Sequence, residues 1–305
     1  MPNLWVNELE HGNDEDNSGV VGDVYGASFV SNTSDPCWSP PNKPADLCDH
    51  GTRMASVLGA TGNNNRQIAG VLWSCKMIAV KVFGQGGMPA SDAIQGMEYA
   101  YKRGSRLMNC SWTIRTTASD LPPLRQFFSN TTDVLYVFGA ANDTMNLDQV
   151  PHHPDCLGRH WFPQEFDNPN LIVVGASDRF DQKWYQDTTI QCGWGVGSNW
   201  GASSVDLFAP GVEIAELIAG DADNNYTTVF YDGFGTSESA PLVTGVAALI
   251  LNQNPSWTPA QVKQRILCTV DLVSNLAGLC VTGYPSAGGR LNAARSLDPT
   301  FICSP

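Results

Sequence analysis

Two short segments of the sequence join a reactive side chain to a backbone that can use it. One places His50 just before the helix-like run 56–60, and the other places Ser237 among small residues before the helix-like run 242–251. An imidazole, with an unperturbed pKa of about 6.5, suits a general base near neutral pH. The unpaired N–H groups and positive dipole end of a helix after Ser237 would favour an alkoxide-like oxygen and a developing oxyanion.

A third segment ends an apolar strand-like run with small residues and then Asn142, whose side-chain amide can donate to a carbonyl oxygen. Taken singly, each of these residues has a more ordinary explanation. His50 would be a solvated loop histidine, Ser237 a helix N-cap and Asn142 a turn residue. Only their combination favours chemistry.

The three segments together resemble those of the subtilisin-like serine peptidases (the subtilase, S8 family). That family has a His-Gly-Thr segment, then an Asn after an Ala-rich strand end, then Gly-Thr-Ser-x-Ser-Ala-Pro, and the same order holds here. Five more segments look like family segments in family order, so that the likeness runs from about Gly19 to about Leu297; they are 62–65, 68–71, 81–83, 209–211 and 289–294.

The resemblance implies a serine endopeptidase that hydrolyses peptide bonds through an acyl-enzyme. Ser237 would be the nucleophile, His50 the general base, and Asn142 would hold the oxyanion together with the Ser237 N–H. The residues expected to line the substrate are Ser111, Trp112, Thr113, Gly139 and Ala140. The expected partners are polypeptide substrates, the expected state is a monomer, and no cofactor is required for the chemistry.

One family feature has no match in this sequence. The third catalytic residue, an Asp in an Asp-Ser/Thr-Gly segment that ends the first strand, orients the imidazole. Aligning Trp5, the acidic loop after it and the run 23–26 with a bacterial-like branch of the family places that Asp before Met1. We therefore expect an N-terminally truncated peptidase of very weak activity. The alternative is a non-catalytic peptide-binding protein that has lost the Asp.

Smaller departures from the family pattern lie beside the predicted site. Ala141 stands where the family has Gly before the Asn, and Thr113-Ile114 replaces two glycines. Glu238 follows the nucleophile, and its charge near His50 would raise the pKa of the imidazole. This predicts a more alkaline optimum of activity.

Strand-like and helix-like segments alternate along the chain. Apolar runs rich in β-branched and aromatic residues predict strands at 77–83, 106–111, 134–140, 171–176 and 205–209. A helix is expected after Ser91, with Ile94, Met97 and Tyr101 as its apolar stripe and Gly104 as its end. Another should begin at Thr258 with a capping box.

This alternation predicts an α/β fold, with a mainly parallel twisted sheet and helices on both faces. No linker divides the chain, so residues 1–305 are expected to form a single peptidase domain with an acidic loop region at 1–30. The resemblance adds that the fold is subtilisin-like and lacks its first strand.

Composition excludes several kinds of partner. The formal charge is −13 and only 15% of residues are charged, which argues against disordered and coiled-coil proteins and against nucleic acid binding. No apolar run reaches the roughly 20 residues of a spanning helix, so no membrane association is expected. Oxygen ligands in the acidic loop predict a structural calcium site, with a solvated acidic turn as the alternative; they are Asp14, Asp16, Ser18 and Asp23.

Cysteine placement and N-x-Ser/Thr sequons favour a secreted protein whose export signal is missing from this chain. Three pairs bracket loop-like sequence and are candidate disulfides; they are Cys37–Cys48, Cys156–Cys192 and Cys268–Cys280. Cys75 and Cys110 lie in apolar runs and are expected to be buried thiols, which leaves Cys303 as the odd one. The sequons begin at Asn32, Asn109, Asn130, Asn142 and Asn225.

Overall fold

The computed structural model describes most of the chain. The described residues are 3–8, 20–31, 49–84, 87–116, 121–149, 160–162, 166, 168–185, 197–218, 228–280 and 289–303. Backbone contacts group the chain into two compact units, residues 1–106 with 216–230 and residues 107–215 with 231–305. That residues 1–305 form a single domain stays a prediction.

The first unit contains a two-stranded parallel sheet of β1 (Gly26–Ser28) and β2 (Ala79–Lys81). Helix α2 (Ala90–Lys102) packs against β2. Gly96 makes this close approach possible, since a Cβ there would lie 2.3 Å from a methyl carbon of Val82. The unit also holds helix α1 (His50–Gly59).

Helix α2 confirms part of its prediction. It begins at Ala90 after Pro89, two residues before the expected start, and Gly104 lies just beyond its end with a left-handed φ of 78°. Met97 is buried, but Ile94 and Tyr101 are only half-buried. The predicted stripe was therefore partly wrong, because small residues with the spacing i, i+3, i+4 and i+7 face inward; with Met97 they are Ala93, Gly96 and Ala100.

The second unit is built on a six-stranded sheet with the order β11-β12-β8-β7-β5-β3. Its strands are β3 (Leu107–Cys110), β5 (Leu135–Gly139), β7 (Leu171–Ser177), β8 (Leu207–Pro210), β11 (Asp271–Leu272) and β12 (Gly289–Arg290). Every neighbouring pair is parallel except β11 with β12. All five predicted strands form, and the mainly parallel sheet is confirmed.

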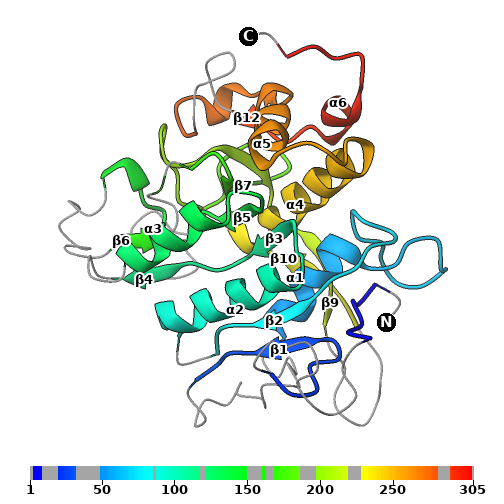
Figure 1. The fold of residues 1–305 in the computed structure, drawn as a ribbon. Helices are drawn as coiled ribbons and strands as arrows, with labels where there is room; N and C mark the ends of the chain where they lie inside the picture. Colours follow the sequence, from blue (N-terminus) through cyan, green and yellow to red (C-terminus); the bar gives the residue numbers. More distant parts are fainter. Residues whose placement is uncertain are drawn as a thin grey trace. The chain divides into compact units, whose positions relative to one another are not determined.

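Strand β5 shows how helices come to cover both faces of this sheet. Leu135 and Val137 pack in one core cluster with α4 (Thr236–Gln253) and α5 (Pro259–Cys268). Tyr136 and Phe138 point the other way and meet Phe128 of α3 (Leu121–Asn130), with ring centroids 4.8 and 6.2 Å apart. Period-two alternation of large apolar side chains thus gives β5 a helix on each side (Figure 1).

Shorter elements complete the described chain. They are β4 (Ile114–Thr116), β6 (His160–Phe162), β9 (Ile214–Ile218), β10 (Thr228–Gly233), α6 (Ala293–Leu297) and the 3₁₀ turns Leu147–Gln149 and Ser274–Leu276. Strands β4 and β6 are antiparallel, and β9 pairs with β10. The capping box at Thr258 is confirmed: Gln261 N–H donates to Thr258 Oγ1 (3.3 Å), and Thr258 N–H donates to Gln261 Oε1 (2.8 Å).

The structure corrects one cysteine prediction. Cys268 is bonded to Cys303, with Cα atoms 5.6 Å apart, and Cys280 is a buried thiol. Arg265 brings the C-terminal tail to Cys268 by donating to the Phe301 carbonyl (2.7 Å). Burial raises the pKa of Cys280 to about 11. Cys75 and Cys110 are both thiols, as predicted, but only Cys110 is buried and Cys75 is half-buried. The cysteines of the other two predicted pairs lie outside the described residues; they are Cys37, Cys48, Cys156 and Cys192.

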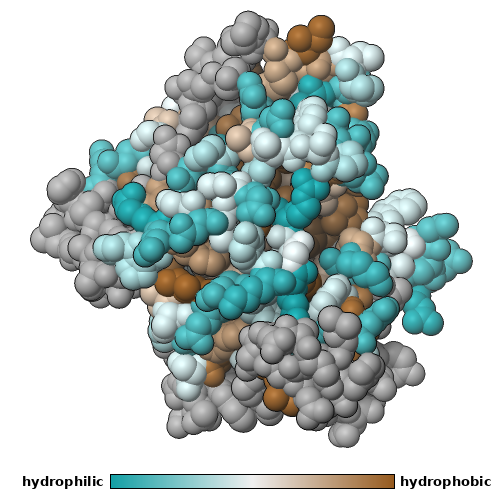
Figure 2. All heavy atoms as spheres, in the orientation of Figure 1, coloured by the Kyte–Doolittle hydropathy of each residue, from teal (hydrophilic) through white to brown (hydrophobic). Residues whose placement is uncertain are grey.

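Apolar residues form neither a large patch in the view of Figure 2 nor a long apolar helix among the described residues. In the view of Figure 2, hydrophilic residues predominate and the hydrophobic ones form small separate groups. Within the described residues, no helix combines the length and the hydropathy that crossing a membrane would need.

Candidate active site

Asn142 is held with its amide in a fixed direction. It follows β5 through Ala141, whose left-handed φ of 71° turns the chain sharply. The side-chain oxygen of Asn142 accepts from the Thr236 N–H (3.0 Å) and from Thr236 Oγ1 (2.9 Å). Because Oδ1 accepts both hydrogen bonds from Thr236, Nδ2 is the end of the side-chain amide that makes neither of them. A Cβ at Gly235 would lie 3.1 Å from Nδ2, so only glycine leaves room beside the amide.

Ser237 is the second residue of α4, at the end of the helix where N–H groups have no intrahelical acceptor. Its Oγ donates to the carbonyl of Ser111 (3.3 Å), and Ser111 Oγ donates to the carbonyl of Ser237 (2.7 Å). The second bond has a cause in the sequence. Residue 241 is a proline and lacks the N–H that would bond to the Ser237 carbonyl within the helix, so the Ser111 hydroxyl takes that place.

Two residues that the sequence reasoning missed extend this network. Asn109 Nδ2 donates to Ser111 Oγ (3.0 Å), and Thr244 Oγ1 donates to Asn109 Oδ1 (3.1 Å). Asn109 lies two residues before Ser111, which puts both on the same side of an extended strand. Thr244 lies seven residues after Ser237, two turns along the same helix face. Both spacings are visible in the sequence and could have identified them.

The predicted substrate-lining residues occupy the ends of β3 and β5. Ser111 and Gly139 reach the turn of Ser237, since a Cβ at Gly139 would lie 2.8 Å from both the carbonyl and the hydroxyl oxygen of Thr236. Trp112 is half-buried and packs edge-on against Phe138, with centroids 4.9 Å apart. Of the other two, Thr113 is half-buried and Ala140 is buried.

The loop that carries Asn142 rests on Asn199, a fully buried residue that the sequence reasoning also missed. Asn199 Oδ1 accepts from the N–H groups of Asp143 (3.0 Å) and Met145 (2.8 Å), and Asn199 N–H donates to the Ala141 carbonyl (2.9 Å). A single buried amide therefore satisfies two N–H groups of this turn, whose backbone also pairs with Gly197 and Trp200. No motif in the sequence marks Asn199.

Glu238 is buried beside the same turn, with 3% of its surface exposed. A Cβ at Gly235 would lie 2.9 Å from Glu238 Oε2, so the carboxyl group of Glu238 and the amide of Asn142 flank the same glycine. An acidic residue in the first turn of a helix is favoured by the helix dipole. The predicted alkaline optimum stays a prediction.

His50, in the first unit, is the first residue of helix α1, which therefore begins earlier than the helix-like run 56–60 that the sequence predicted. Asp49 at the N-cap position has a left-handed φ of 67° and makes no side-chain cap hydrogen bond. The imidazole is half-buried and meets the edge of Phe83, with ring centroids 5.4 Å apart. The direction of this side chain therefore depends on where α1 is held.

The predicted calcium ligands are described only in part. Asp14, Asp16 and Ser18 lie outside the described residues. Asp23 is fully buried, and its carboxylate accepts from Asn7 Nδ2 (3.1 Å), from the Tyr99 hydroxyl and from the Arg103 guanidinium. Within the described part of the chain, no three His, Cys, Asp or Glu side chains come together as metal ligands would. The calcium site stays a prediction.

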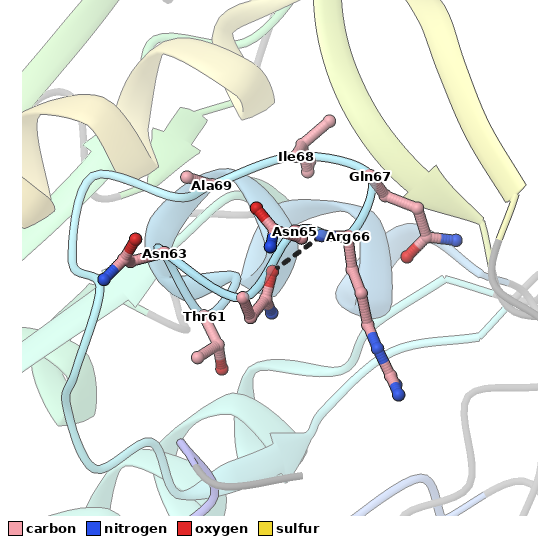
Figure 3. Close-up of a pocket in the computed structure, with 8 residues that line it drawn as sticks. Thr61, Asn63, Asn65, Arg66, Gln67, Ile68 and Ala69 are labelled. Atoms are coloured by element: carbon pink, nitrogen blue, oxygen red, sulfur yellow. Dashed lines mark hydrogen bonds between the residues drawn. The ribbon is translucent and has the colours of Figure 1, made fainter.

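A hollow lies in the loop that follows α1, within the first unit. Its volume is about 430 Å³ and its lining residues are Thr61, Asn63, Asn64, Asn65, Arg66, Gln67, Ile68 and Ala69 (Figure 3). Asn63, Asn65 and Gln67 have left-handed φ angles of 53°, 53° and 40°. None of the predicted catalytic or substrate residues lines this hollow.

Comparisons with known proteins identify the family of the chain. A sequence model of the subtilase family, Peptidase S8, matches residues 13–289. Subtilisin-like protease 1 of Plasmodium falciparum is 24% identical over 305 residues, subtilisin E of Bacillus subtilis 28% over 251, and M-protease of Shouchella clausii 29% over 253. The matches cover 96%, 82% and 82% of this chain but only 40%, 56% and 55% of those relatives.

Solved structures show the same fold. A protease from Pseudoalteromonas arctica PAMC 21717 has a TM-score of 0.65 and 21% identity, and the match covers 97% of this chain and 87% of that one. The prenylagaramide maturation protease PagA has a TM-score of 0.61 and 21% identity, with 89% and 90% covered. At this identity the likeness is one of fold.

Proposed function

The chain belongs to the subtilase family, and on that basis we propose that it carries the site of a serine endopeptidase. In this proposal Ser237 is the nucleophile, His50 the general base and Asn142 an oxyanion donor, with polypeptides as substrates. The chain spans about half the length of the relatives it matches, so this activity is proposed for the site that these residues build.

The fixed amide of Asn142 carries the proposal. Its oxygen accepts hydrogen bonds from Thr236, the residue before the nucleophile, and its Nδ2 lies beside Gly235, where an added Cβ would be 3.1 Å away. An asparagine that served only to form a turn would not need hydrogen bonds to the helix that carries the serine. A donor held in place before the reaction is what oxyanion stabilisation requires, because no reorganisation is needed as charge develops.

The proposed reaction has two steps, the acylation of Ser237 and the hydrolysis of the acyl-enzyme. Ser237 Oγ attacks the substrate carbonyl carbon while its proton passes to His50, and the resulting oxyanion accepts hydrogen bonds from Asn142 Nδ2 and the Ser237 N–H. The C–N bond then breaks, and His50 returns the proton to the leaving amine. Water repeats the sequence on the acyl-enzyme and releases the acid product.

Residues 1–305 contain no Asp-Ser/Thr-Gly segment that would supply the orienting carboxylate. In the serine peptidases where this was measured, loss of that carboxylate lowers turnover by roughly 10⁴. We therefore expect this polypeptide to hydrolyse peptides slowly, at a rate set by the oxyanion donors, the nucleophile and an imidazole without its usual partner.

A turnover assay tests the proposal directly. Hydrolysis of a fluorogenic peptide library by residues 1–305 is compared with hydrolysis by Ser237→Ala, His50→Gln and the control Ser239→Ala. We expect slow hydrolysis that the first two variants abolish. Ser239 donates to the carbonyls of Ala209 (3.0 Å) and Pro210 (3.1 Å) and, at a longer distance, of Gly235 (3.4 Å). Its hydroxyl has no part in the proposed reaction, so its variant should keep the activity. Hydrolysis that survives Ser237→Ala would overturn the proposal.

The second candidate is a non-catalytic peptide-binding protein, favoured by the Ser237 hydroxyl donating to the Ser111 carbonyl. The wild type and the Ser237→Ala variant also distinguish this candidate from the peptidase. A peptide that binds with the same affinity to wild type and Ser237→Ala, and that stays intact in both, would support the binding protein.

We also propose that the protein acts outside the cell and carries a structural calcium ion at the acidic loop. The bond between Cys268 and Cys303 supports an oxidising compartment. The spacing of Asp14, Asp16 and Ser18 supports calcium. Added calcium should raise the melting temperature of the wild type but not of Asp16→Ala, and an equal rise in both would contradict the site.

A further inference from the structure

A buried ion pair lies on the helix that begins with His50. Glu216 of β9 has no exposed surface, and its Oε2 accepts from the guanidinium of Arg53, whose side chain is 28% exposed. A carboxylate without access to water is costly unless a cation stays beside it. The other oxygen, Oε1, has no hydrogen-bond partner among the described residues, so Arg53 is the cation on which Glu216 depends.

Two further contacts join the same turn of α1 to the same pair of strands. Leu217 N–H, next to Glu216, donates to Ser56 Oγ (2.9 Å), and Ser56 Oγ donates in turn to the Arg53 carbonyl (2.6 Å). The Arg53 guanidinium also lies over the ring of Phe230 in β10, 5.0 Å from its centroid. Helix α1 is thus attached to both β9 and β10.

These contacts lie on the face of α1 that includes His50. Residues three apart on a helix are neighbours, and His50, Arg53 and Ser56 form one such row. At the start of the helix, Asp49 makes no side-chain cap hydrogen bond, and the His50 ring meets the edge of Phe83. The contacts of Arg53 and Ser56 with β9 and β10 hold the helix whose first residue is His50.

We propose that Arg53 and Glu216 form a positioning pair for His50, which we call the α1 clamp. The clamp holds α1 on the β9–β10 pair and so fixes the direction of the imidazole that the proposed peptidase uses as its base. This inference rests on the proposed function for its catalytic meaning, while the placement of His50 can be tested without activity.

The decisive variant is Glu216→Gln, which keeps the shape of the side chain and removes its charge. Edge contact with Phe83 shifts the proton resonances of His50 by its ring current, and these are assigned among the five histidines by comparison with His50→Gln. We expect the His50 resonances of Glu216→Gln to move toward those of an unstructured histidine. Resonances unchanged in both Glu216→Gln and Arg53→Met would overturn the clamp.

Glu213→Gln is the matched control. It makes the same charge change three residues earlier, at a carboxylate that is half exposed and paired with an exposed Arg179 at 3.0 Å. An exposed pair of this kind contributes little. Its His50 resonances should stay at the wild-type positions. A control that shifts them as much as Glu216→Gln would attribute the effect to net charge and contradict the clamp.

A conservative variant separates positioning from folding. Arg53→Lys keeps the cation but loses the planar group over Phe230, and it should keep a folded protein with a His50 shift between those of wild type and Glu216→Gln. In the same variant we expect kcat to fall about tenfold, with KM changed less than twofold. A wild type that shows the expected resonances and no hydrolysis would contradict the proposed function and leave the clamp standing.

Discussion

The turn of Ser237 and the turn of His50 are held by different physical means. Around Ser237 the supporting groups are neutral: hydroxyls, side-chain amides and backbone, joined by hydrogen bonds of 2.7–3.3 Å through Ser111, Asn109 and Thr244. Around His50 the support is the α1 clamp, whose carboxylate is fully buried. One region is held by several neutral hydrogen bonds, and the other combines a buried ion pair with one hydrogen bond and a ring contact.

This difference predicts different failures. Losing one neutral hydrogen bond costs about 1 kcal/mol and leaves the other bonds in place. Losing one member of a buried ion pair leaves a charge without compensation, which costs several times more. The nucleophile should therefore tolerate substitution around it better than the base does.

The largest effect is expected for Arg53→Met, which leaves the Glu216 carboxylate buried and unpaired. We expect a loss of roughly 3–5 kcal/mol in the free energy of unfolding, measured by urea denaturation. The double variant Arg53→Met with Glu216→Leu removes both charges and should recover most of the loss. Equal instability of the single and double variants would show that the charge is not the cause.

The next effect concerns catalysis. Asn142→Asp keeps an oxygen that can accept from Thr236 but replaces the donating Nδ2 by a second oxygen. We expect kcat to fall by about 10²–10³, the loss known from the subtilisins themselves for removal of this donor. Asn146→Asp makes the same chemical change at a residue whose Oδ1 accepts from Asp148 N–H, and it is the control. A similar fall in both variants would contradict the oxyanion role.

Much of this fold follows from local pattern, and the supporting contacts do not. Apolar β-branched runs locate the parallel strands, and a capping box locates Thr258, because both signals lie within a few residues of the element they define. Asn199 and Glu216 carry no such signal. Each becomes important only when the chain brings a partner 50 or more residues away to it, as Asp143 and Arg53 are.

The predicted helix stripe and disulfide failed for related reasons. The inward face of α2 is made of small residues such as Ala93, which were passed over in favour of the larger Ile94. Cys280 lies closer in sequence to Cys268 than Cys303 does, but Arg265 brings the tail that carries Cys303 to the helix end. In both cases the outcome depends on tertiary contacts, which neither the size of a residue nor its distance along the sequence predicts.

A smaller effect tests whether the backbone at Ala141, just before Asn142, is strained. Ala141 has a φ of 71°, a conformation that costs a non-glycine residue about 1 kcal/mol. Ala141→Gly should stabilise the protein by about 0.5 kcal/mol after the entropy cost of glycine is included, as measured by thermal unfolding. Ala140→Gly, at a buried neighbour whose φ is not left-handed, should destabilise it. The same sign for both would contradict strain at Ala141.

The smallest effect concerns a partly exposed ion-pair network at β11, which contrasts with the buried clamp. Partial burial of Asp271 acts to raise the pKa of its carboxyl, but hydrogen bonds from Asn292 and Arg290 and the charges of Arg295 and Arg290 outweigh it, so the pKa is lowered. The stabilisation is therefore present above the unfolded pKa of about 3.9 and is lost as the pH falls through the lower folded value.

Asp271→Asn tests that sign. The variant should be less stable than the wild type at pH 7, and the difference should shrink as the pH falls below about 4, as measured by the midpoint of urea unfolding at each pH. A difference that stays constant from pH 7 to pH 2 would show that the carboxylate charge at Asp271 contributes nothing to stability.

The site of covalent modification by a fluorophosphonate is the most direct measurement of the central claim. After prolonged incubation of residues 1–305 with the probe, tandem mass spectrometry of the digested protein should locate one adduct on Ser237. The adduct should be absent from His50→Gln and much slower to form in Asn142→Asp. An adduct on another serine, or labelling of Ser237 at the same rate without His50, would contradict the account.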